Sequence, residues 1–234
     1  MEPFVSFPPL ESEDGWLTHF SRLPTTTAMT ANQSQIFSQA LDYYLGDGAK
    51  YKPELYKLSQ QNTKEADEKI LKYFMEGARL RATVGLYRDY IPASSSTTPA
   101  TVVDTSSKTP TAADNVTVPV GRRVLVDLIL ASQDPVAFPN PTEVDLNRPL
   151  DSYLHYGWGP HQCAGMDASM TAMTAMFKTV FGLKGLRRAT TSWGESPGEL
   201  KKIPAAGGIT IYMTPDQSSF FPFPTTMKVV WDEE

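Results

Sequence analysis

The ten residues from Tyr156 to Gly165, YGWGPHQCAG, restrict the possible folds of this chain more than any other stretch. They hold its single cysteine, Cys163, among three glycines and a proline. One cysteine cannot form an internal disulfide framework, which is typical of proteins from a reducing compartment. Glycines allow backbone conformations and close approaches that other residues cannot reach, so the loop is suited to lie against a flat, rigid object.

Cys163 alone supports more than one interpretation. A lone cysteine is most often a small buried hydrophobic residue. This one shortly precedes a stretch with helical spacing, residues 166–183, and the amides at a helix N-terminus stabilise a thiolate. A zinc site would need further cysteines or histidines at ligand spacing, which the sequence lacks. A papain-like nucleophile would need a distant histidine, and only His19 is far from the loop, whereas His155 and His161 flank it.

Helical spacing of apolar residues predicts two more long helices. The first covers residues 25–45, after Pro24, and ends at the glycines of GDG. The second covers residues 63–83, and its inner stripe consists of Ile70, Leu71, Phe74 and Ala78. In the helix at 166–183 the stripe, which we interpret as core, consists of Met166, Met170, Met173, Phe177 and Val180.

The remaining segments favour loops and short strands. Residues 1–24 are proline-rich and irregular, and residues 92–115 are rich in Ser, Thr and Pro, which indicates a solvated loop insertion. Residues 116–131 are strand-like with a turn at Gly121, and the C-terminal tail suggests two short strands around a turn. Residues 134–149 contain four prolines, so we expect an ordered meander or a loop there. The predicted fold class is mainly α with small β elements.

Charge and hydropathy argue against several classes of function. The net charge is −5 and no dense block of Lys and Arg occurs, which argues against a nucleic-acid partner. The longest apolar run, VLVDLILA, is interrupted by Asp127 and is too short to span a bilayer. The acidic, proline-broken start does not resemble a secretory signal. We therefore expect a cytoplasmic protein, with or without association to lipid.

The loop YGWGPHQCAG resembles the haem-binding signature of the cytochrome P450 superfamily, in which an aromatic residue precedes a glycine-framed loop with the iron-ligating cysteine. Tyr156 stands where phenylalanine is usual and His161 where arginine is commoner. The resemblance implies that Cys163 is the axial thiolate ligand of haem b, a ligand that favours O–O cleavage, and that His161 hydrogen-bonds a haem propionate. The residues implied to contact the cofactor are Cys163, His161, Tyr156, Gly157, Gly159 and Gly165.

A Glu-x-x-Arg pattern lies upstream, in the helix predicted at residues 63–83. Glu76 and Arg79 are three residues apart and share a helix face, so they can form an ion pair. By itself such a pair is most simply a solvated surface pair of little energetic value. In the P450 superfamily a pair of this kind is completed by an arginine from the meander, and Arg148 occupies that position here. The resemblance implies a buried charge triad that holds the cysteine loop in register.

The helix predicted at residues 25–45 lacks the acid that P450 monooxygenases usually carry over the haem. Its stretch TAMTANQSQIF contains no Asp or Glu, and the first acid is Asp42. Asn32 and Gln35 share one face at about 100° per residue. An amide can donate a hydrogen bond to a developing oxyanion, so Asn32 is the first candidate for a catalytic residue and Gln35 the second. Polar residues on a solvated helix face would explain the same pattern.

The ANQSQ stretch and the C-terminal tail resemble the fungal fatty acid diol synthases, or psi-factor-producing oxygenases. In that subfamily a haem dioxygenase is fused to a C-terminal P450 domain. The resemblance implies that the dioxygenase makes a polyunsaturated fatty acid hydroperoxide and that the P450 domain isomerises it to a dihydroxy acid. Alternatives are an NADPH- and reductase-dependent monooxygenase, an allene oxide-forming dehydratase, and a truncated fragment with no catalysis.

The resemblance covers only the C-terminal half of a P450 fold, in residues 25–234. The N-terminal half of that domain and the fused dioxygenase have no counterpart, so we expect this chain to expose an apolar face where the missing half packs. Six residues fall where the superfamily contacts substrate, although ordinary core packing explains them equally well: Val84, Gly85, Leu86, Ala206, Gly207 and Ile209.

Overall fold

The computed structural model describes residues 31–81, 85–90, 99–103, 115–159, 162–189, 202–204, 210–214, 218–221, 224 and 227–233. The predictions for residues 1–24, and for the start of the helix at 25–45, lie outside these ranges. Among the described residues, no helix combines the length and apolar character needed to cross a membrane.

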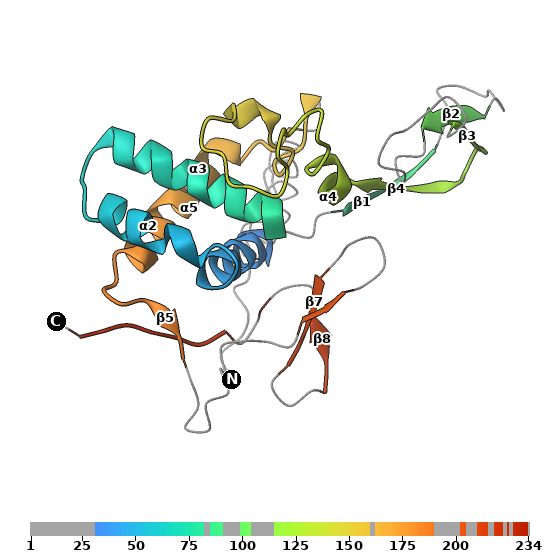
Figure 1. Cartoon of the computed structure of the whole chain (residues 1–234). Coiled ribbons are helices and arrows are strands. Elements are labelled where there is room, and N and C mark those ends of the chain that lie inside the picture. The colour runs from blue at the N-terminus through green and yellow to red at the C-terminus, as the bar shows by residue number, and fades with distance from the viewer. Residues whose placement is uncertain are drawn as a thin grey trace, which may run out of the picture.

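Helices form the main body of the molecule (Figure 1). They are a helix over residues 31–45, η1 (Ala49–Tyr51), α2 (Lys52–Ser59), α3 (Lys64–Arg81), α4 (Leu128–Ala131), η3 (Leu150–Ser152) and α5 (Met166–Phe181). The helix α3 begins where the Thr63 hydroxyl accepts a hydrogen bond from the amide of Ala66 at 3.2 Å. Acidic residues occupy its first turn and basic residues its last, as the helix dipole favours. The predicted helix at 63–83 therefore forms with nearly the predicted ends.

The core lies where α2, α3 and α5 meet the helix over 31–45. Tyr44 is fully buried at this junction, and its hydroxyl donates to the carbonyl of Tyr73 at 2.5 Å. Gly77 allows this approach, because a Cβ at that position would lie 2.6 Å from Tyr44 Cε2. On α5, Met173 and Phe177 are buried as predicted. The stripe is rotated from the predicted one: Ser169 and Phe181 are also buried, whereas Met166, Met170 and Val180 are only half-buried.

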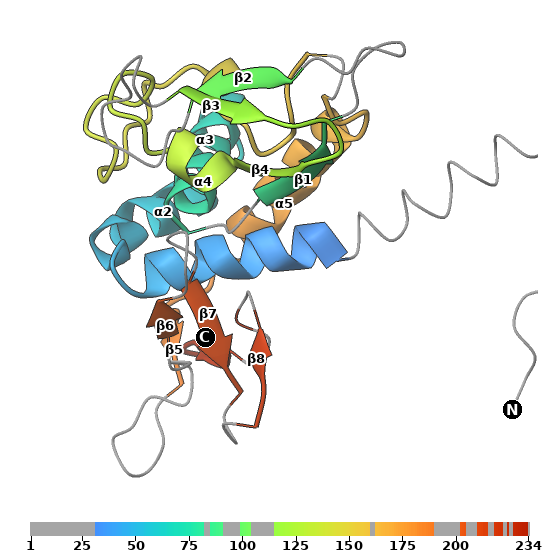
Figure 2. The same cartoon turned by 90° about the vertical axis from the view of Figure 1, so that its right-hand side faces the viewer.

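The helix over 31–45 and α5 run in the same general direction. Phe37 makes an edge-to-face contact with Phe177, and Tyr44 makes one with Phe181, at ring distances of 5.5 and 5.9 Å. The order of contacts is therefore the same along both helices. Their N-terminal ends lie on the same side of the molecule, the right-hand side of Figure 2. This arrangement places the beginning of the 31–45 helix and the cysteine loop at one end of the helical layer.

Small antiparallel sheets surround the helices, so the fold class is mainly α with small β elements, as predicted. The pairs are β1 (Gly85–Asp89) with β4 (Arg123–Asp127), β2 (Ala100–Val103) with β3 (Asn115–Val118), and β5 (Arg187–Arg188) with β9 (Val229–Val230). A fourth sheet, of three strands, has the order β6 (Lys202–Pro204), β7 (Thr210–Met213), β8 (Phe220–Phe221).

Two segments differ from the sequence expectation. The stretch 92–115, predicted as a solvated loop, contains β2, because its run of Thr and Val residues can pair in register with a second β-branched run in β3. The strand-like stretch 116–131 ends in the short helix α4. There the Asp127 carboxylate accepts from the amides of Ile129 and Leu130, both at 3.0 Å, and caps a helical turn. The predicted turn is present, with Gly121 at φ +76°.

Candidate functional site

Cys163 lies between the glycine loop and the first turn of α5, and its side chain is exposed. Its amide donates to the carbonyl of Tyr156 at 2.7 Å, and its carbonyl accepts from the amide of Met166 at 3.2 Å. Gly157 and Gly159 have φ values of +73° and +59°, in the left-handed region that favours glycine. The loop geometry therefore requires glycine at these two positions and presents the thiol outward.

Among the described residues, the glycines around the thiol leave space beside it. Apart from its chain neighbours, a Cβ built at Gly159 would meet none of these residues within 4 Å, and one built at Gly165 would meet only Cys163 Sγ, at 3.8 Å. No group of three His, Cys, Asp or Glu that could hold a metal ion occurs in the part of the chain that the structure describes. A single cysteine sulfur with open space beside it fits an iron whose other ligands come from a planar macrocycle. The residues present therefore fit haem.

Glu76 is the centre of a buried network beneath the loop. Its carboxylate accepts two hydrogen bonds from Arg79, at 2.8 and 2.9 Å, and one from the amide of Asp145 at 3.0 Å. The Tyr153 hydroxyl donates to Glu76 Oε1 at 2.8 Å. Arg148 Nε lies 3.3 Å from the same oxygen, close enough for an ion pair but out of line for a hydrogen bond. The structure thus brings Glu76, Arg79 and Arg148 together, and all three are buried.

The two arginines of this network also order the meander between residues 134 and 148, which has no regular helix or strand. Their remaining guanidinium groups donate to main-chain carbonyls at 2.5 to 3.3 Å, those of Ser132, Pro139, Asn140, Pro141 and Glu143. Phe138 is buried between them, with Arg79 Cζ at 5.3 Å and Arg148 Cζ at 5.6 Å from its ring centre. Buried carbonyls need donors, and the arginines supply them where proline cannot.

Two aromatic side chains connect this network to the cysteine loop. Burial, aided by the Glu76 charge, raises the pKa of Tyr153 well above its usual value, so its hydroxyl remains a donor. The His155 ring lies 6.0 Å from that of Tyr153, and its Nδ1 is buried without a hydrogen bond to any described residue. Burial lowers the pKa of His155 to about 4; the Arg79 charge acts in the same direction, and the Ala78 carbonyl and Glu76 oppose it.

The candidate amides lie at the start of the 31–45 helix. Asn32 is exposed and Gln35 is half-buried. Both belong to the first two turns of this helix, whose N-terminal end lies on the same side of the molecule as that of α5 (Figure 2). The first acid of this helix, Asp42, is buried and ion-paired with Arg188, which is a partner from the other end of the chain.

Several predicted contacts cannot be placed. His161, Val84, Ala206, Gly207 and Ile209 lie outside the described residues. Gly85 and Leu86 belong to β1, opposite Asp127 and Val126 of β4.

Three features of this region were not predicted from the sequence. These are the Tyr153 hydroxyl on Glu76, the Tyr156 hydroxyl 3.0 Å from Ser169 Oγ, and the Asp42 cluster. A tyrosine where phenylalanine is usual was a visible signal for the second. Its partner could not be identified, because Ser169 carries no pattern of its own.

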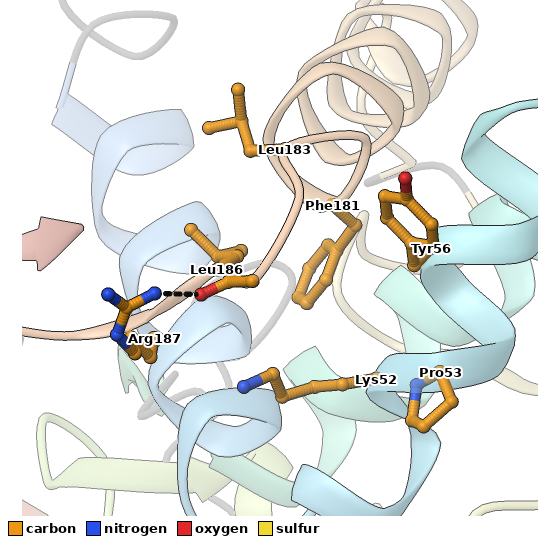
Figure 3. Close-up of a pocket in the computed structure, with 8 residues that line it drawn as sticks. Lys52, Pro53, Tyr56, Phe181, Leu183, Leu186 and Arg187 are labelled. Atoms are coloured by element: carbon orange, nitrogen blue, oxygen red, sulfur yellow. Dashed lines mark hydrogen bonds between the residues drawn. The ribbon is translucent and has the colours of Figure 1, made fainter. Parts of the chain in front are cut away.

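A cavity of about 300 Å³ opens between α2, the end of α5 and β5 (Figure 3). Its lining consists of Lys52, Pro53, Tyr56, Phe181, Leu183, Gly185, Leu186 and Arg187. Burial and the neighbouring charge of Arg187 lower the pKa of Lys52. Phe181 is the last residue of α5, whereas Cys163 precedes its first turn, so the length of the helix, about 24 Å, separates this cavity from the thiol. It belongs to a different part of the molecule.

The chain is similar to known proteins. The cytochrome P450 family model matches residues 97–182. Psi-producing oxygenase A of Aspergillus fumigatus is 46% identical over 90% of this chain, and linoleate diol synthase of Gaeumannomyces graminis is 43% identical over 90%. A bifunctional dioxygenase–epoxy alcohol synthase of Fusarium oxysporum is also 46% identical. The chain spans only 18%, 20% and 15% of the lengths of these relatives.

Solved structures share the fold at lower identity. The Tepidiphilus thermophilus P450 heme domain superposes with a TM-score of 0.58 at 18% identity, over 87% of this chain and 41% of that one. An intact type IV self-sufficient cytochrome P450 monooxygenase gives 0.64 at 17% identity, over 94% of this chain and 23% of that one. The chain thus corresponds to less than half of a complete heme domain.

Proposed function

This chain belongs to the cytochrome P450 superfamily, a family of oxidoreductases. We propose that it is the cysteine-bearing part of a haem-thiolate domain and that this domain isomerises a fatty acid hydroperoxide. The relatives at 43–46% identity are named as psi-producing oxygenase and diol synthase, which supports fatty acid oxylipin synthesis as the activity of the longer protein. The N-terminal part of the domain and a fused dioxygenase, which would supply the hydroperoxide, are the proposed partners.

The cofactor in this proposal is haem b, with Cys163 as its axial ligand. The macrocycle would lie beside the thiol, where Gly157, Gly159 and Gly165 leave space. Tyr156 would hold the loop through the hydrogen bond between its carbonyl and the Cys163 amide. His161 is proposed to bind a propionate. Bound haem supplies the redox chemistry that cleaves the O–O bond. Cys163 would hold the haem iron through its sulfur, and a thiolate ligand of this kind favours O–O cleavage.

Asn32 is the proposed catalytic amide, with Gln35 as the second candidate. An amide NH₂ can donate a hydrogen bond to an oxygen on which charge develops, and it keeps its protons at neutral pH. The reaction balances without an external reductant: the O–O bond breaks, one oxygen stays on its carbon as a hydroxyl, and the other enters a C–H bond of the same acid. Residues that deliver protons from solvent are therefore not needed at this position.

The observation that carries the proposal is the state of Asp42. It is the first acid of the helix, and it is buried and held by Arg188. An acid in this environment cannot relay protons to an oxygen site ten residues earlier on the helix, which lies about 15 Å away along the axis. A reductant-driven monooxygenase needs such a relay, whereas an isomerase does not.

A second product class is supported by one relative. The Fusarium oxysporum protein is named as an epoxy alcohol synthase at 46% identity, so rearrangement of the same hydroperoxide to an epoxy alcohol is the nearest alternative. Dehydration to an allene oxide is a further one. All of these reactions would begin with cleavage of the same O–O bond, and they differ in where the second oxygen goes.

The test uses the haem-loaded polypeptide that carries this chain, with linoleic acid hydroperoxide and no NADPH. We expect hydroperoxide consumption and dihydroxy acid as the product, separated by chromatography and mass spectrometry. The Cys163→Ser variant should lose activity, and Asn32→Leu should lower turnover about 100- to 1,000-fold while haem content stays the same. The Asn32→Gln variant is the matched control, because it retains an amide side chain. Turnover that requires NADPH and a reductase would refute the isomerase.

A further inference from the structure

The segment that leads into the cysteine loop is tied to two helices by tyrosine hydroxyls. The Tyr153 hydroxyl donates to Glu76 of α3 at 2.8 Å. The Tyr156 hydroxyl lies 3.0 Å from Ser169 Oγ of α5, and the Ser169 side chain is buried. Residues 153–156 are therefore held from two sides, immediately before the chain reverses at Gly157, whose φ is +73°.

Tyr156 also contacts Cys163 directly. Its carbonyl accepts the hydrogen bond from the Cys163 amide at 2.7 Å. From Cys163 the chain enters α5, where the Ser169 amide donates to the carbonyl of Gly165 at 2.9 Å. The contacts close a ring, from Ser169 through the Tyr156 side chain and carbonyl to Cys163 and back along the helix. A displacement of the Tyr156 ring would therefore displace the cysteine relative to α5.

We propose that Tyr156 and Ser169 are positioning residues that set the place of Cys163 relative to α5. The role toward the iron rests on the proposed function, but the tether itself does not. A phenylalanine at 156 would fill the same space without reaching Ser169. The two hydroxyls act as a unit, because removal of either leaves the other in a largely buried site without this partner. Their combined effect should be non-additive.

The primary test measures hydrogen exchange of the Cys163 amide in the intact chain without added haem. Tyr156→Phe and Ser169→Ala should each accelerate this exchange about fivefold, as expected for the loss of one net hydrogen bond, and the double variant should add little. Ser169→Thr, which keeps a hydroxyl, should exchange like the wild type. Tyr44→Phe is the matched control. It also removes a buried tyrosine hydrogen bond, the 2.5 Å bond from Tyr44 to the carbonyl of Tyr73, but this bond does not involve the cysteine loop.

In Tyr44→Phe the exchange rates of the Cys163 amide and of the α3 amides should rise by the same factor, so the ratio of the two rates stays constant. An unchanged rate at Cys163 in both Tyr156→Phe and Ser169→Ala would overturn the tether. So would a ratio that changes in Tyr44→Phe as much as it does in those two variants. The second readout is the spectrum of the reduced carbon monoxide complex of the haem-loaded protein. Tyr156→Phe should increase the fraction without the thiolate-type Soret shift, and Tyr44→Phe should not.

The two readouts separate the tether from the assigned chemistry. If exchange accelerates but wild-type protein never shows a thiolate-type spectrum, the tether is supported and the haem-thiolate function is refuted. If the wild-type spectrum is of the thiolate type and Tyr156→Phe and Ser169→Ala leave its fraction unchanged, the positioning role toward iron is refuted.

Discussion

Glu76 and Asp42 occupy similar environments in different regions of the molecule. Each carboxylate is buried, each lies near two arginines, and each accepts a hydrogen bond from a tyrosine hydroxyl. Around Glu76 the two arginines come from the same helix and the meander, and the tyrosine follows the meander closely. Around Asp42 they come from far along the chain, since Arg188 and Tyr212 are 146 and 170 residues away.

The difference lies in what each cluster organises. The Glu76 arginines donate to four meander carbonyls and to the carbonyl of Ser132 just before the meander, and so order a proline-rich segment without secondary structure. The Asp42 cluster joins helix to sheet: Arg188 of β5 donates to the carbonyls of Asp42 and Leu45 at 3.0 and 3.3 Å. Buried charge thus supplies order in two ways in this molecule, as a scaffold for an irregular loop and as a link between distant segments. Both cost desolvation, so neither is retained for net stability alone.

The largest expected effect is from Glu76→Gln. This change leaves Arg79 and Arg148 buried without a counter-charge, and it should lower the free energy of unfolding by about 3–5 kcal/mol. Urea unfolding followed by circular dichroism measures it. Asp42→Asn is the matched comparison and should cost less, because Arg81 is 18% exposed and can turn to water and to Asp47.

Location distinguishes the two changes further. Hydrogen exchange should rise first at residues 134–148 in Glu76→Gln, and at β5 and β7 in Asp42→Asn. An equal loss of stability in the two variants, with the same pattern of exchange, would contradict the division of roles.

Acid should affect the Glu76 region through His155. Its pKa is about 4 in the folded chain and about 6.5 in an unfolded one, so between these values the unfolded state binds more protons and stability rises with pH. This histidine should therefore lower the free energy of unfolding by about 2 kcal/mol between pH 7 and pH 5. The check compares the pH dependence of the wild type with that of His155→Asn, which cannot titrate. Identical slopes would show that His155 protonates as readily when folded.

The smallest difference is expected between the two tyrosine hydroxyls. Tyr153→Phe removes a donor 2.8 Å from Glu76, and a hydrogen bond to a charged group contributes about 1.5 kcal/mol. Tyr212→Phe removes one at 3.3 Å from Asp42 and should cost less than 1 kcal/mol, roughly, because the contact is longer. Thermal and urea unfolding of both variants give the ranking. A larger loss of unfolding free energy in Tyr212→Phe than in Tyr153→Phe would contradict this ranking. It would mean that burial of the carboxylate, rather than the length of the hydrogen bond, decides how much the bond stabilises the fold.

Part of this architecture follows from local sequence. The helices α3 and α5 form where apolar spacing predicts them, and Gly121 and Gly157 adopt the positive φ that their turns require. The meander lacks regular structure because its prolines lack amide donors and break helices. The pair Glu76–Arg79 was visible because residues three apart meet on one helix face.

Other features depend on contacts between segments far apart in the chain. Strand β2 forms inside a Ser/Thr/Pro-rich stretch only because β3 pairs with it, and single-strand propensity is too weak to indicate that. Ser169 has no motif, and its importance comes from the Tyr156 hydroxyl 3.0 Å away.

The family resemblance, the cysteine in its glycine loop and the helices on either side were predictable, because they depend on residue type and short-range spacing. The contacts of Asp42 with Arg188, of Tyr153 with Glu76 and of Ser169 with Tyr156 were not. Such contacts arise from the path of the whole chain: burial makes a polar partner necessary, and which partner comes within reach depends on how the helices pack.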